Sequence, residues 1–324
     1  MQNKQIILNA DDYGACAFIN DGITEAVRIG KINSVSCFVT HESSKKDILE
    51  LIDLKQKYKF EVGLHFSITS GHPITTCSSM KAGPGKPFYL VHEHNYLNIN
   101  LDELRTELRN QINQLQAFLD SKSAGKVDHI TVHHGVIYFF DRLFNVLKEV
   151  AEQNDIPIRS PMPWSKSDFK FYDYDQPRNI YDLAIPIKIE GIRNGAAIFW
   201  NNVQRGKFRD KALLKMLRGQ GKDNIERQIK TLSGKVRFPI CYADTIYGQP
   251  FLENIIYLIS QVPDSKTVEF MFHLGSGNEL VNAPHGINRD YFKHRKLELA
   301  ALRHLDFRQI LSDYKIITAN YSEL

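Results

Sequence analysis

The feature that most constrains this sequence is an alternation of short apolar runs with segments of helical periodicity. The runs are rich in β-branched and aromatic residues, and they lie at residues 6–8, 34–39, 60–68, 129–134, 156–158, 236–242, 268–272 and 315–317. The helical segments between them are 20–29, 44–58, 101–119, 141–153, 249–261 and 289–302. Such alternation predicts βαβ units and a parallel sheet. About eight strands would fit an α/β fold with a single (β/α) barrel-like domain over residues 1–324.

Two long segments without a regular pattern, 75–100 and 160–180, interrupt this alternation. Irregular segments of this length are usually functional loops or disordered, so we expect long loops at the carboxyl ends of the strands. The second segment holds Trp164 together with several Phe and Tyr residues. Their ring faces suit stacking on a sugar, which makes Trp164 a candidate substrate-binding residue. The alternative is that these rings only pack the loop down.

Composition excludes several classes of protein. The chain has 324 residues, of which 43% are hydrophobic and 24% charged, as in ordinary globular proteins. A net charge of +4 gives little attraction to nucleic acid or to a membrane surface. No apolar run approaches a membrane span, and the start is too polar for a signal peptide. The four cysteines form no CxxC motif or close pair, so we expect reduced thiols in a cytoplasmic protein.

Polar residues concentrate where the predicted strands end, which is where parallel α/β folds bind ligands. Asp11 and Asp12 follow the first run. Adjacent side chains point to opposite sides of an extended chain, but a break at Gly14 would let both carboxylates face one site. One could then bind a metal and the other could act as a general base. The alternative is an Asx turn or a cap for the helix that follows.

Histidines supply the second group of candidate ligands. His65 lies in the third run, and the HITVHH segment contains His129, His133 and His134. His129 and His133 are expected to share a strand face, whereas His134 points elsewhere. Neutral imidazole is a common transition-metal ligand, and one Asp with two His would leave positions open for water and substrate. A single strand histidine can equally be a hydrogen-bonded core residue.

Three further polar residues follow later strands. His273 lies in FMFHLGSG without a second histidine nearby, which favours a proton donor with a pKa near neutrality over a metal ligand. The alternative is a turn formed by the glycines that follow. Arg159 and Asp244 are candidates for orienting catalytic groups or for ordinary ion pairs. The GPG sequence at 83–85 lacks the strand, lysine and helix of a phosphate-binding loop.

These motifs occur in an order that resembles the YdjC-like (ChbG/HpnK) carbohydrate deacetylase family. They are LNADDYG followed by Asn20, Gly22 and Ile23, then GKINSVSCFV, VGLHFSITSGHPI, HITVHH, IPIRSP, and FHLG followed by YFKHRKLEL. The resemblance covers most of the chain. It implies a (β/α) barrel-like fold and metal-assisted hydrolysis of N-acetyl groups on sugars such as chitooligosaccharides.

The resemblance also implies roles for individual residues. By position in the motifs, Asp12, His65 and His133 would hold one divalent metal. Asp11 would be the general base and His273 the general acid. The family implies Mg²⁺, whereas two imidazoles favour Zn²⁺ or another first-row ion.

Arg159 and Asp244 fall where the family has polar site residues, and we group them with Trp164 as candidate substrate-binding residues. The implied partner is an acetylated sugar, and neither nucleic acid nor a membrane is expected. The sequence leaves the oligomeric state open, with a homodimer as one alternative.

The sequence departs from the family pattern in the HITVHH segment. Where the family usually reads HxDSHxHxH, the aspartate is Thr131, and two later histidines are Gly135 and Ile137. HLG also replaces the usual HPG. A threonine cannot accept a charge-assisted hydrogen bond or orient an imidazole as a carboxylate does. Two other functions therefore remain open: a sugar-binding protein without turnover, and another barrel metallohydrolase such as a phosphoesterase.

Overall fold

The computed structural model describes residues 4–41, 44–90, 94–161, 221–232, 234, 236–243, 252–277, 289–304 and 306–324. In this part of the chain a seven-stranded sheet has the order β4-β3-β2-β1-β6-β5, with β7 paired to β1 outside this path. Every strand pair is parallel. The strands are β1 (Lys4–Tyr13), β2 (Ser34–Cys37), β3 (Glu61–Phe66), β4 (Ile130–Val132), β5 (Cys241–Ala243), β6 (Thr267–Phe272) and β7 (Ile316–Thr318). The predicted α/β fold with a parallel sheet is confirmed.

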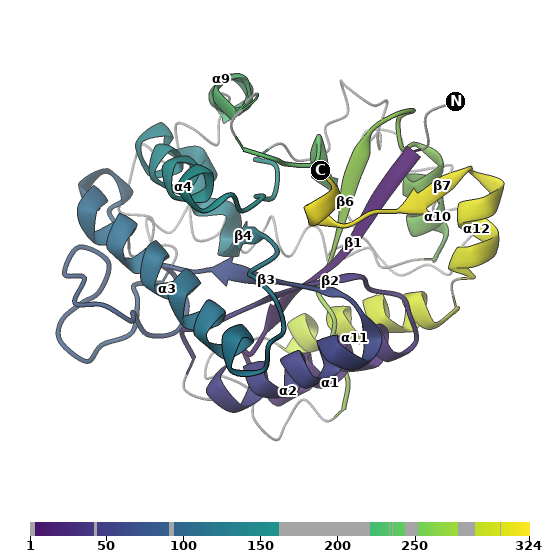
Figure 1. Ribbon diagram of the computed structural model, residues 1–324, viewed down its shortest axis with the longest axis horizontal. Helices are drawn as coiled ribbons and strands as arrows, with labels where there is room; N and C mark the ends of the chain where they lie inside the picture. The colour runs from purple at the N-terminus through teal and green to yellow at the C-terminus, as the bar shows by residue number, and fades with distance from the viewer. Residues whose placement is uncertain are drawn as a thin grey trace.

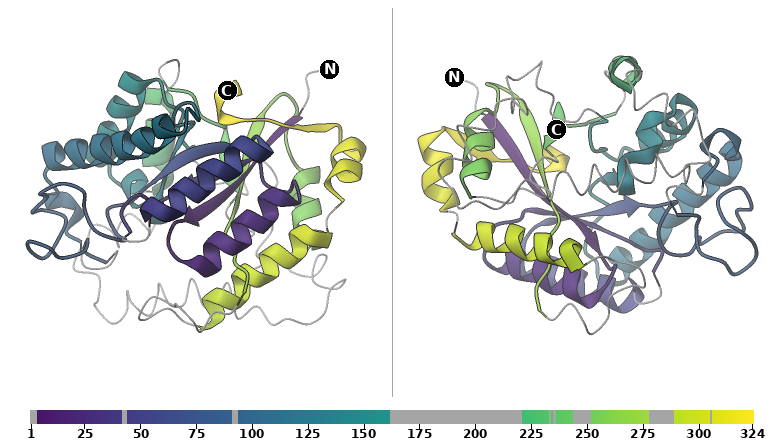
Figure 2. Two further views of the ribbon diagram at one scale, coloured as in Figure 1. Left: turned by 60° about the horizontal axis from the view of Figure 1, so that its bottom comes forward. Right: turned by 180° about the vertical axis from the view of Figure 1, so that it is seen from behind.

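Helices surround the sheet in the same order as the strands they connect (Figure 1). Contacts run from α9 to α4, α3, α2, α1, α11 and α10 in turn, and Figure 2 shows α2, α1 and α11 side by side. The α-helices are α1 (Ala17–Arg28), α2 (Ser44–Tyr58), α3 (Leu101–Ser121), α4 (Asp141–Asn154), α9 (Gly221–Leu232), α10 (Leu252–Ser260), α11 (Arg289–His304) and α12 (Phe307–Asp313). The 3₁₀ helices are η1 (Tyr96–Asn98), η2 (His133–Phe139) and η4 (Tyr321–Glu323).

Backbone hydrogen bonds link the two edges of the curled sheet. Ile158 forms a parallel bridge with Ile130 of β4, and its N–H donates to the carbonyl of Arg237 at 3.0 Å. Shortly before β5, the N–H of Ile240 donates to the carbonyl of Thr267 in β6, also at 3.0 Å. The segment around Ile158, which we predicted as a strand, therefore contributes only this bridge. The sheet is barrel-like, as expected.

The last strand differs from the expected arrangement of about eight strands in one ring. β7 pairs with residues 4–6, at the start of β1. Further along, β1 is already flanked by β2 and β6, so β7 extends the sheet at one end only. The helices α9 and α12 were not predicted, because α9 carries few apolar residues and α12 spans only seven residues.

The helix α1 packs directly against the end of β6. A Cβ atom added to Gly22 would lie only 2.5 Å from the backbone nitrogen of Gly275, closer than atoms approach in proteins. The two backbones can therefore meet only because both residues are glycines. On the same helix the side chain of Asn20 accepts a hydrogen bond from the N–H of Gly14 at 2.7 Å, which fixes the turn after β1.

The first long loop is anchored by carboxylates of α3. The N–H groups of Ile74 and Thr75 donate to Glu107 at 3.0 and 2.9 Å, and the N–H of Ser79 donates to Glu103 at 2.8 Å. Residues 91–93 of this loop, and the second predicted loop from residue 162 onward, lie outside the described residues.

The four cysteines are not joined in disulfides, and only Cys16 among them is partly exposed. This agrees with the expected absence of a disulfide framework. Among the helices of the described residues, none has the length and apolar character needed to cross a membrane.

Candidate metal centre

An irregularity at the end of β1 brings two adjacent carboxylates into the protein interior. The pairing of β1 with β2 shifts register between Ala10 and Tyr13, and Asp12 has a φ of 75°. Such a backbone costs about 1–3 kcal/mol in a non-glycine residue and is typical of functional sites. Asp11 and Asp12 are both buried, although a regular strand would point them to opposite faces. The break thus occurs at Asp12 itself, before the expected position at Gly14.

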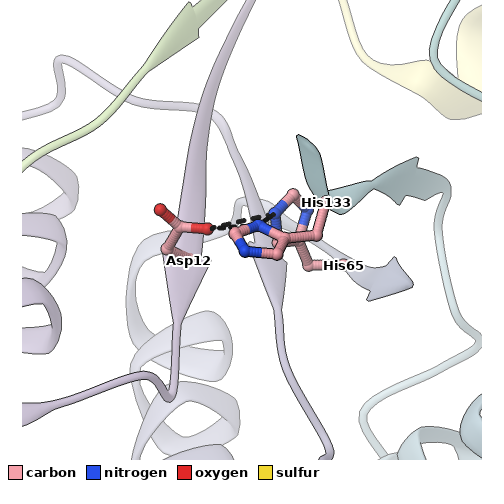
Figure 3. A group of neighbouring side chains, drawn as sticks. All are labelled: Asp12, His65 and His133. Atoms are coloured by element: carbon pink, nitrogen blue, oxygen red, sulfur yellow. Dashed lines mark hydrogen bonds and ion pairs between the residues drawn. The ribbon is translucent and has the colours of Figure 1, made fainter. Parts of the chain in front are cut away.

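The three predicted metal ligands converge at the carboxyl ends of β1, β3 and β4 (Figure 3). Oδ1 of Asp12 lies 3.1 Å from Nε2 of His65 and 3.3 Å from Nδ1 of His133. The two ring nitrogens are 3.1 Å apart. All three atoms lie within 4.8 Å of one another. We call these three residues the metal-ligand cluster.

The chemistry of this cluster fits a divalent metal. Among the residues that the structure describes, no donor makes a hydrogen bond of suitable geometry to the buried Oδ1 of Asp12. Burial lowers the pKa of His133, so the ring is neutral and offers a lone pair. Burial acts to raise the pKa of Asp12, but Arg295, His133 and His65 together outweigh it, and the pKa lies well below its usual value. One carboxylate oxygen and two imidazole nitrogens therefore point at the same place, a ligand set typical of first-row metals.

Arg295 is a site residue that sequence reasoning missed. It lies in α11 with 1% of its surface exposed, and its Nη2 pairs with Oδ2 of Asp12. The arginine thereby occupies one carboxylate oxygen and leaves Oδ1 facing the two histidines. The residue belongs to the YFKHRKLEL motif, but a helical run rich in Lys and Arg is usually a solvated face. From the same helix, Glu298 accepts a hydrogen bond from the N–H of His273 at 2.6 Å.

Thr131 orients the ring of His65. The two residues are paired in register between β3 and β4, and the Thr131 hydroxyl oxygen lies 2.7 Å from Nδ1 of His65. When Nε2 binds a metal, Nδ1 carries the ring proton and donates it to this oxygen. From the sequence we expected Thr131 to orient the His65 ring less firmly than an aspartate would. The threonine removes the charge of the family aspartate, but it keeps the hydrogen bond.

Phe38 forms an apolar wall beside the metal-ligand cluster. Its ring centroid lies 4.8 Å from that of His65 and 4.9 Å from that of His133, both in edge-on arrangements. Phe38 is itself buried. An apolar neighbour of this kind disfavours the charged form of an imidazole, so it helps to keep His133 neutral and available as a ligand.

Asp11 is held by a buried arginine. Nη1 and Nη2 of Arg159 donate to its two oxygens at 2.7 and 3.0 Å, and Nδ2 of Asn9 donates to Oδ1 at 2.8 Å. Burial acts to raise the pKa of Asp11, but the charge and hydrogen bonds of Arg159, together with His65 and His273, outweigh it, and the pKa falls well below its usual value. The other face of Arg159 contacts Glu269 in β6. Because Arg159 is only 2% exposed, the geometry favours an orienting role over direct substrate binding.

His273 follows β6 at the same end of the sheet. Burial and the nearby charge of Arg295 lower the pKa of His273 to about 4, so its ring is neutral at pH 7. The expected pKa near neutrality is therefore too high, because the sequence did not show that this ring is buried and lies near Arg295. Asp12 and Asp11 both lie close enough to favour its protonated form.

Of the remaining candidates, His129 lies apart from the metal-ligand cluster, His134 packs against His133 with 3.8 Å between ring centroids, and the others fall outside the described residues. Nε2 of His129 lies 3.0 Å from the hydroxyl oxygen of Ser36, deeper in the sheet. His134 has a φ of 57°, and its Nδ1 lies 3.0 Å from the hydroxyl oxygen of Thr69. Asp244 and Trp164 fall among residues that the structure does not describe.

The fold and the cluster define a barrel-like α/β protein with a candidate metal site at the carboxyl ends of its strands. Comparison with known families makes this specific. The chain belongs to the YdjC-like protein family, whose model matches residues 5–313.

Relatives in this family carry deacetylase names. The chain is 31% identical over 160 residues to a chitooligosaccharide deacetylase of Yersinia enterocolitica, covering 48% of this chain and 59% of the relative. It is 33% identical over 156 residues to one from Proteus mirabilis, covering 48% and 58%. A carbohydrate deacetylase of Clostridium beijerinckii is 29% identical over 158 residues, covering 48% and 59%. The chain thus matches less than two thirds of the length of these relatives.

A solved structure supports the fold. A protein of Enterococcus faecalis V583, for which cellobiose-phosphate cleavage is suggested, aligns over 99% of this chain and 98% of its own with a TM-score of 0.67. The identity is 21%, so this likeness concerns the fold alone.

Proposed function

We propose that this protein is a metal-dependent carbohydrate deacetylase, a hydrolase that cleaves the amide bond of N-acetylated sugars or oligosaccharides. The observation that carries the proposal is the convergence of Asp12, His65 and His133 beside the ionised carboxylate of Asp11. The names of the relatives support the substrate class. The ligand set favours Zn²⁺ or another first-row ion, whereas the family resemblance implies Mg²⁺.

In the proposed reaction the residues divide the work of amide hydrolysis. Asp12, His65 and His133 would hold a divalent metal, which would supply Lewis-acid polarisation of the acetyl carbonyl. Asp11 accepts a proton from the attacking water. Its Oδ1 lies 3.8 Å from Nδ1 of His65, next to the cluster, and Arg159 keeps it ionised so that it can accept a proton.

The departing sugar amine needs a proton, and we assign its delivery to His273, which must first take up a proton because its ring is neutral in the free protein. The protonated form of this imidazole is opposed by burial and Arg295 and favoured by the two neighbouring aspartates. Arg159 orients Asp11. Asp244 and Trp164 stay predicted substrate-binding residues.

The test is a screen for acetate release from N-acetylated mono- and oligosaccharides, with Zn²⁺ or Mg²⁺ added to the metal-free protein. Phosphate esters are assayed in parallel. We expect acetate release in the wild type and its loss, together with loss of metal binding, in His65→Ala and His133→Ala. The matched control is His304→Ala, because His304 is exposed on α11 and should leave both properties unchanged.

The outcomes separate the competing functions. Phosphate release without acetate release would favour a phosphoesterase. Binding of metal and oligosaccharide without acetate release would favour a sugar-binding protein. Full acetate release by His65→Ala or His133→Ala would reject the proposed metal centre.

A further inference from the structure

The last residues of the chain lie across the amino-terminal ends of the central strands, opposite the metal-ligand cluster. The N–H of Ala319 donates to the carbonyl of Ile6 at 2.8 Å. The N–H groups of Tyr321 and Ser322 donate to the carboxylate of Glu61, at the start of β3, at 2.6 and 3.0 Å. Figure 1 shows the C-terminus on the side where β1 begins. We call residues 319–324 the floor segment.

The side chain of Tyr321 points from this segment into the sheet interior. It is fully buried, and its ring stacks on His129 with 4.2 Å between centroids and 9° between planes. Its hydroxyl donates a hydrogen bond to Oε2 of Glu269. Burial and the Glu269 charge raise the pKa of Tyr321 well above its usual value, so the hydroxyl keeps the proton that it donates.

Glu269 continues this chain of contacts to Arg159 and Asp11. Nε of Arg159 donates to the two Glu269 oxygens at 2.9 and 3.0 Å, and its Nη atoms hold the two oxygens of Asp11. One guanidinium thus lies between two buried carboxylates. Any shift of Glu269 moves the guanidinium with it, because the planar donor group is rigid.

We propose that Tyr321 is a positioning residue, which through Glu269 and Arg159 fixes the orientation of the Asp11 carboxylate at the opposite end of the sheet. The proposal rests on the proposed role of Asp11. Tyr321 lies beyond residue 313, where the match to the family model ends, so this contact belongs to a part of the chain that the family match does not cover.

The experiment compares Tyr321→Phe with Tyr314→Phe. The first substitution removes only the buried hydroxyl. The second is the matched control, because Tyr314 is 37% exposed at the end of α12. With an N-acetylated oligosaccharide and saturating Zn²⁺, we expect Tyr321→Phe to lower kcat about tenfold, since small displacements of a catalytic group are costly. KM and the Zn²⁺ affinity measured by calorimetry should stay within about twofold of wild type, because the Asp12 side of the site is untouched.

A spectroscopic readout is independent of turnover. The Nε–H of Arg159, identified by loss of its ¹H–¹⁵N signal in Arg159→Lys, should exchange slowly in the wild-type chain and shift in Tyr321→Phe but not in Tyr314→Phe. Rapid exchange of this proton in the wild type would overturn the proposal even if Tyr321→Phe failed to fold. A folded Tyr321→Phe with wild-type kcat would overturn it as well. Absence of acetate release from the wild type would instead reject the proposed function, while the NMR measurement would still decide the contact.

Discussion

Two consecutive residues, Asp11 and Asp12, have opposite surroundings although both are buried and both pair with an arginine. Both oxygens of Asp11 accept hydrogen bonds from Arg159, and Asn9 adds a third. For Asp12, Arg295 pairs with Oδ2, whereas Oδ1 faces two imidazole nitrogens without a hydrogen bond of suitable geometry among the described residues.

The difference follows from how buried carboxylates are stabilised. A buried charge is costly unless it is paired and its lone pairs are satisfied. The surroundings of Asp11 satisfy it without any ligand. Those of Asp12 leave one oxygen that a cation would satisfy. Asp11 is therefore a carboxylate whose hydrogen bonds are complete within the protein, whereas Asp12 is one whose bonding a metal would complete.

The largest effect should come from exchanging each carboxylate for an amide. We expect Asp12→Asn to weaken Zn²⁺ binding by about 100-fold or more, because a metal ligand is altered. Asp11→Asn should bind Zn²⁺ within about threefold of wild type and lose roughly 10³-fold in kcat, as a general base typically contributes 10²–10⁴-fold. Calorimetric titration of the metal and initial rates of acetate release provide the two measurements.

Equal loss of Zn²⁺ affinity in both variants would contradict the separate roles of Asp11 and Asp12. It would mean that Asp11 also binds the metal. Asp53→Asn serves as a control, since Asp53 lies in α2 and pairs at the surface with Lys122.

The next largest effect should be a difference in stability between substitutions of the two arginines, Arg159 and Arg295. Arg159→Met leaves Asp11 and Glu269 buried without their cation, and we expect a loss of about 3–5 kcal/mol in unfolding free energy. Arg295→Met removes the cation that pairs with Oδ2 of Asp12, and here we expect a smaller loss. Zn²⁺ should recover stability in Arg295→Met, because the metal replaces the missing positive charge beside Asp12, but not in Arg159→Met. Denaturant unfolding with Zn²⁺ and with a chelator checks this.

A matched control for both substitutions is Arg303→Met. Arg303 pairs with Glu25 on the surface at 2.5 Å, where such pairs contribute about 0–1 kcal/mol. Equal recovery by Zn²⁺ in Arg159→Met and Arg295→Met would show that the two aspartates do not divide the roles as described.

Much of the fold follows from local sequence patterns. The α2 helix has the predicted bounds, and the apolar runs at 34–39 and 268–272 contain or overlap the strands β2 and β6. Periodicity reports which residues face the core, so it finds such elements reliably. It does not report pairing between distant segments, which is why the position of β7 and the bridge at Ile158 differed from expectation.

The site residues likewise fall into those that local sequence patterns predict and those that they do not. Asp12, His65 and His133 were predicted because strand ends and family motifs mark them. Arg295, Glu269 and Tyr321 were not predicted, since each has an ordinary interpretation in its own segment: a solvated helix, a strand, a chain end. Their importance arises from partners far away in sequence, such as the 110 residues that separate Arg159 from Glu269.

The smallest expected effect concerns the hydroxyl that orients His65. Thr131→Val keeps the shape of a buried side chain but removes the oxygen that lies 2.7 Å from Nδ1. We expect about a tenfold weaker Zn²⁺ affinity, the lower end of the range for groups that orient metal ligands. Calorimetric titration measures it, and Thr318→Val, at an exposed position in β7, is the matched control.

Thr131→Ser shows whether the weaker Zn²⁺ affinity of Thr131→Val comes from the lost hydrogen bond or from altered packing. Serine keeps the hydroxyl and loses only a methyl group, so Zn²⁺ affinity should return close to the wild-type value if the hydrogen bond to His65 matters. Equal weakening in Thr131→Val and Thr131→Ser would assign the effect to packing between β3 and β4. If Thr131→Ser recovers the affinity, Thr131 orients the metal ligand His65 just as Arg159 orients Asp11. Each of the two then holds a functional group in place without being altered by the reaction.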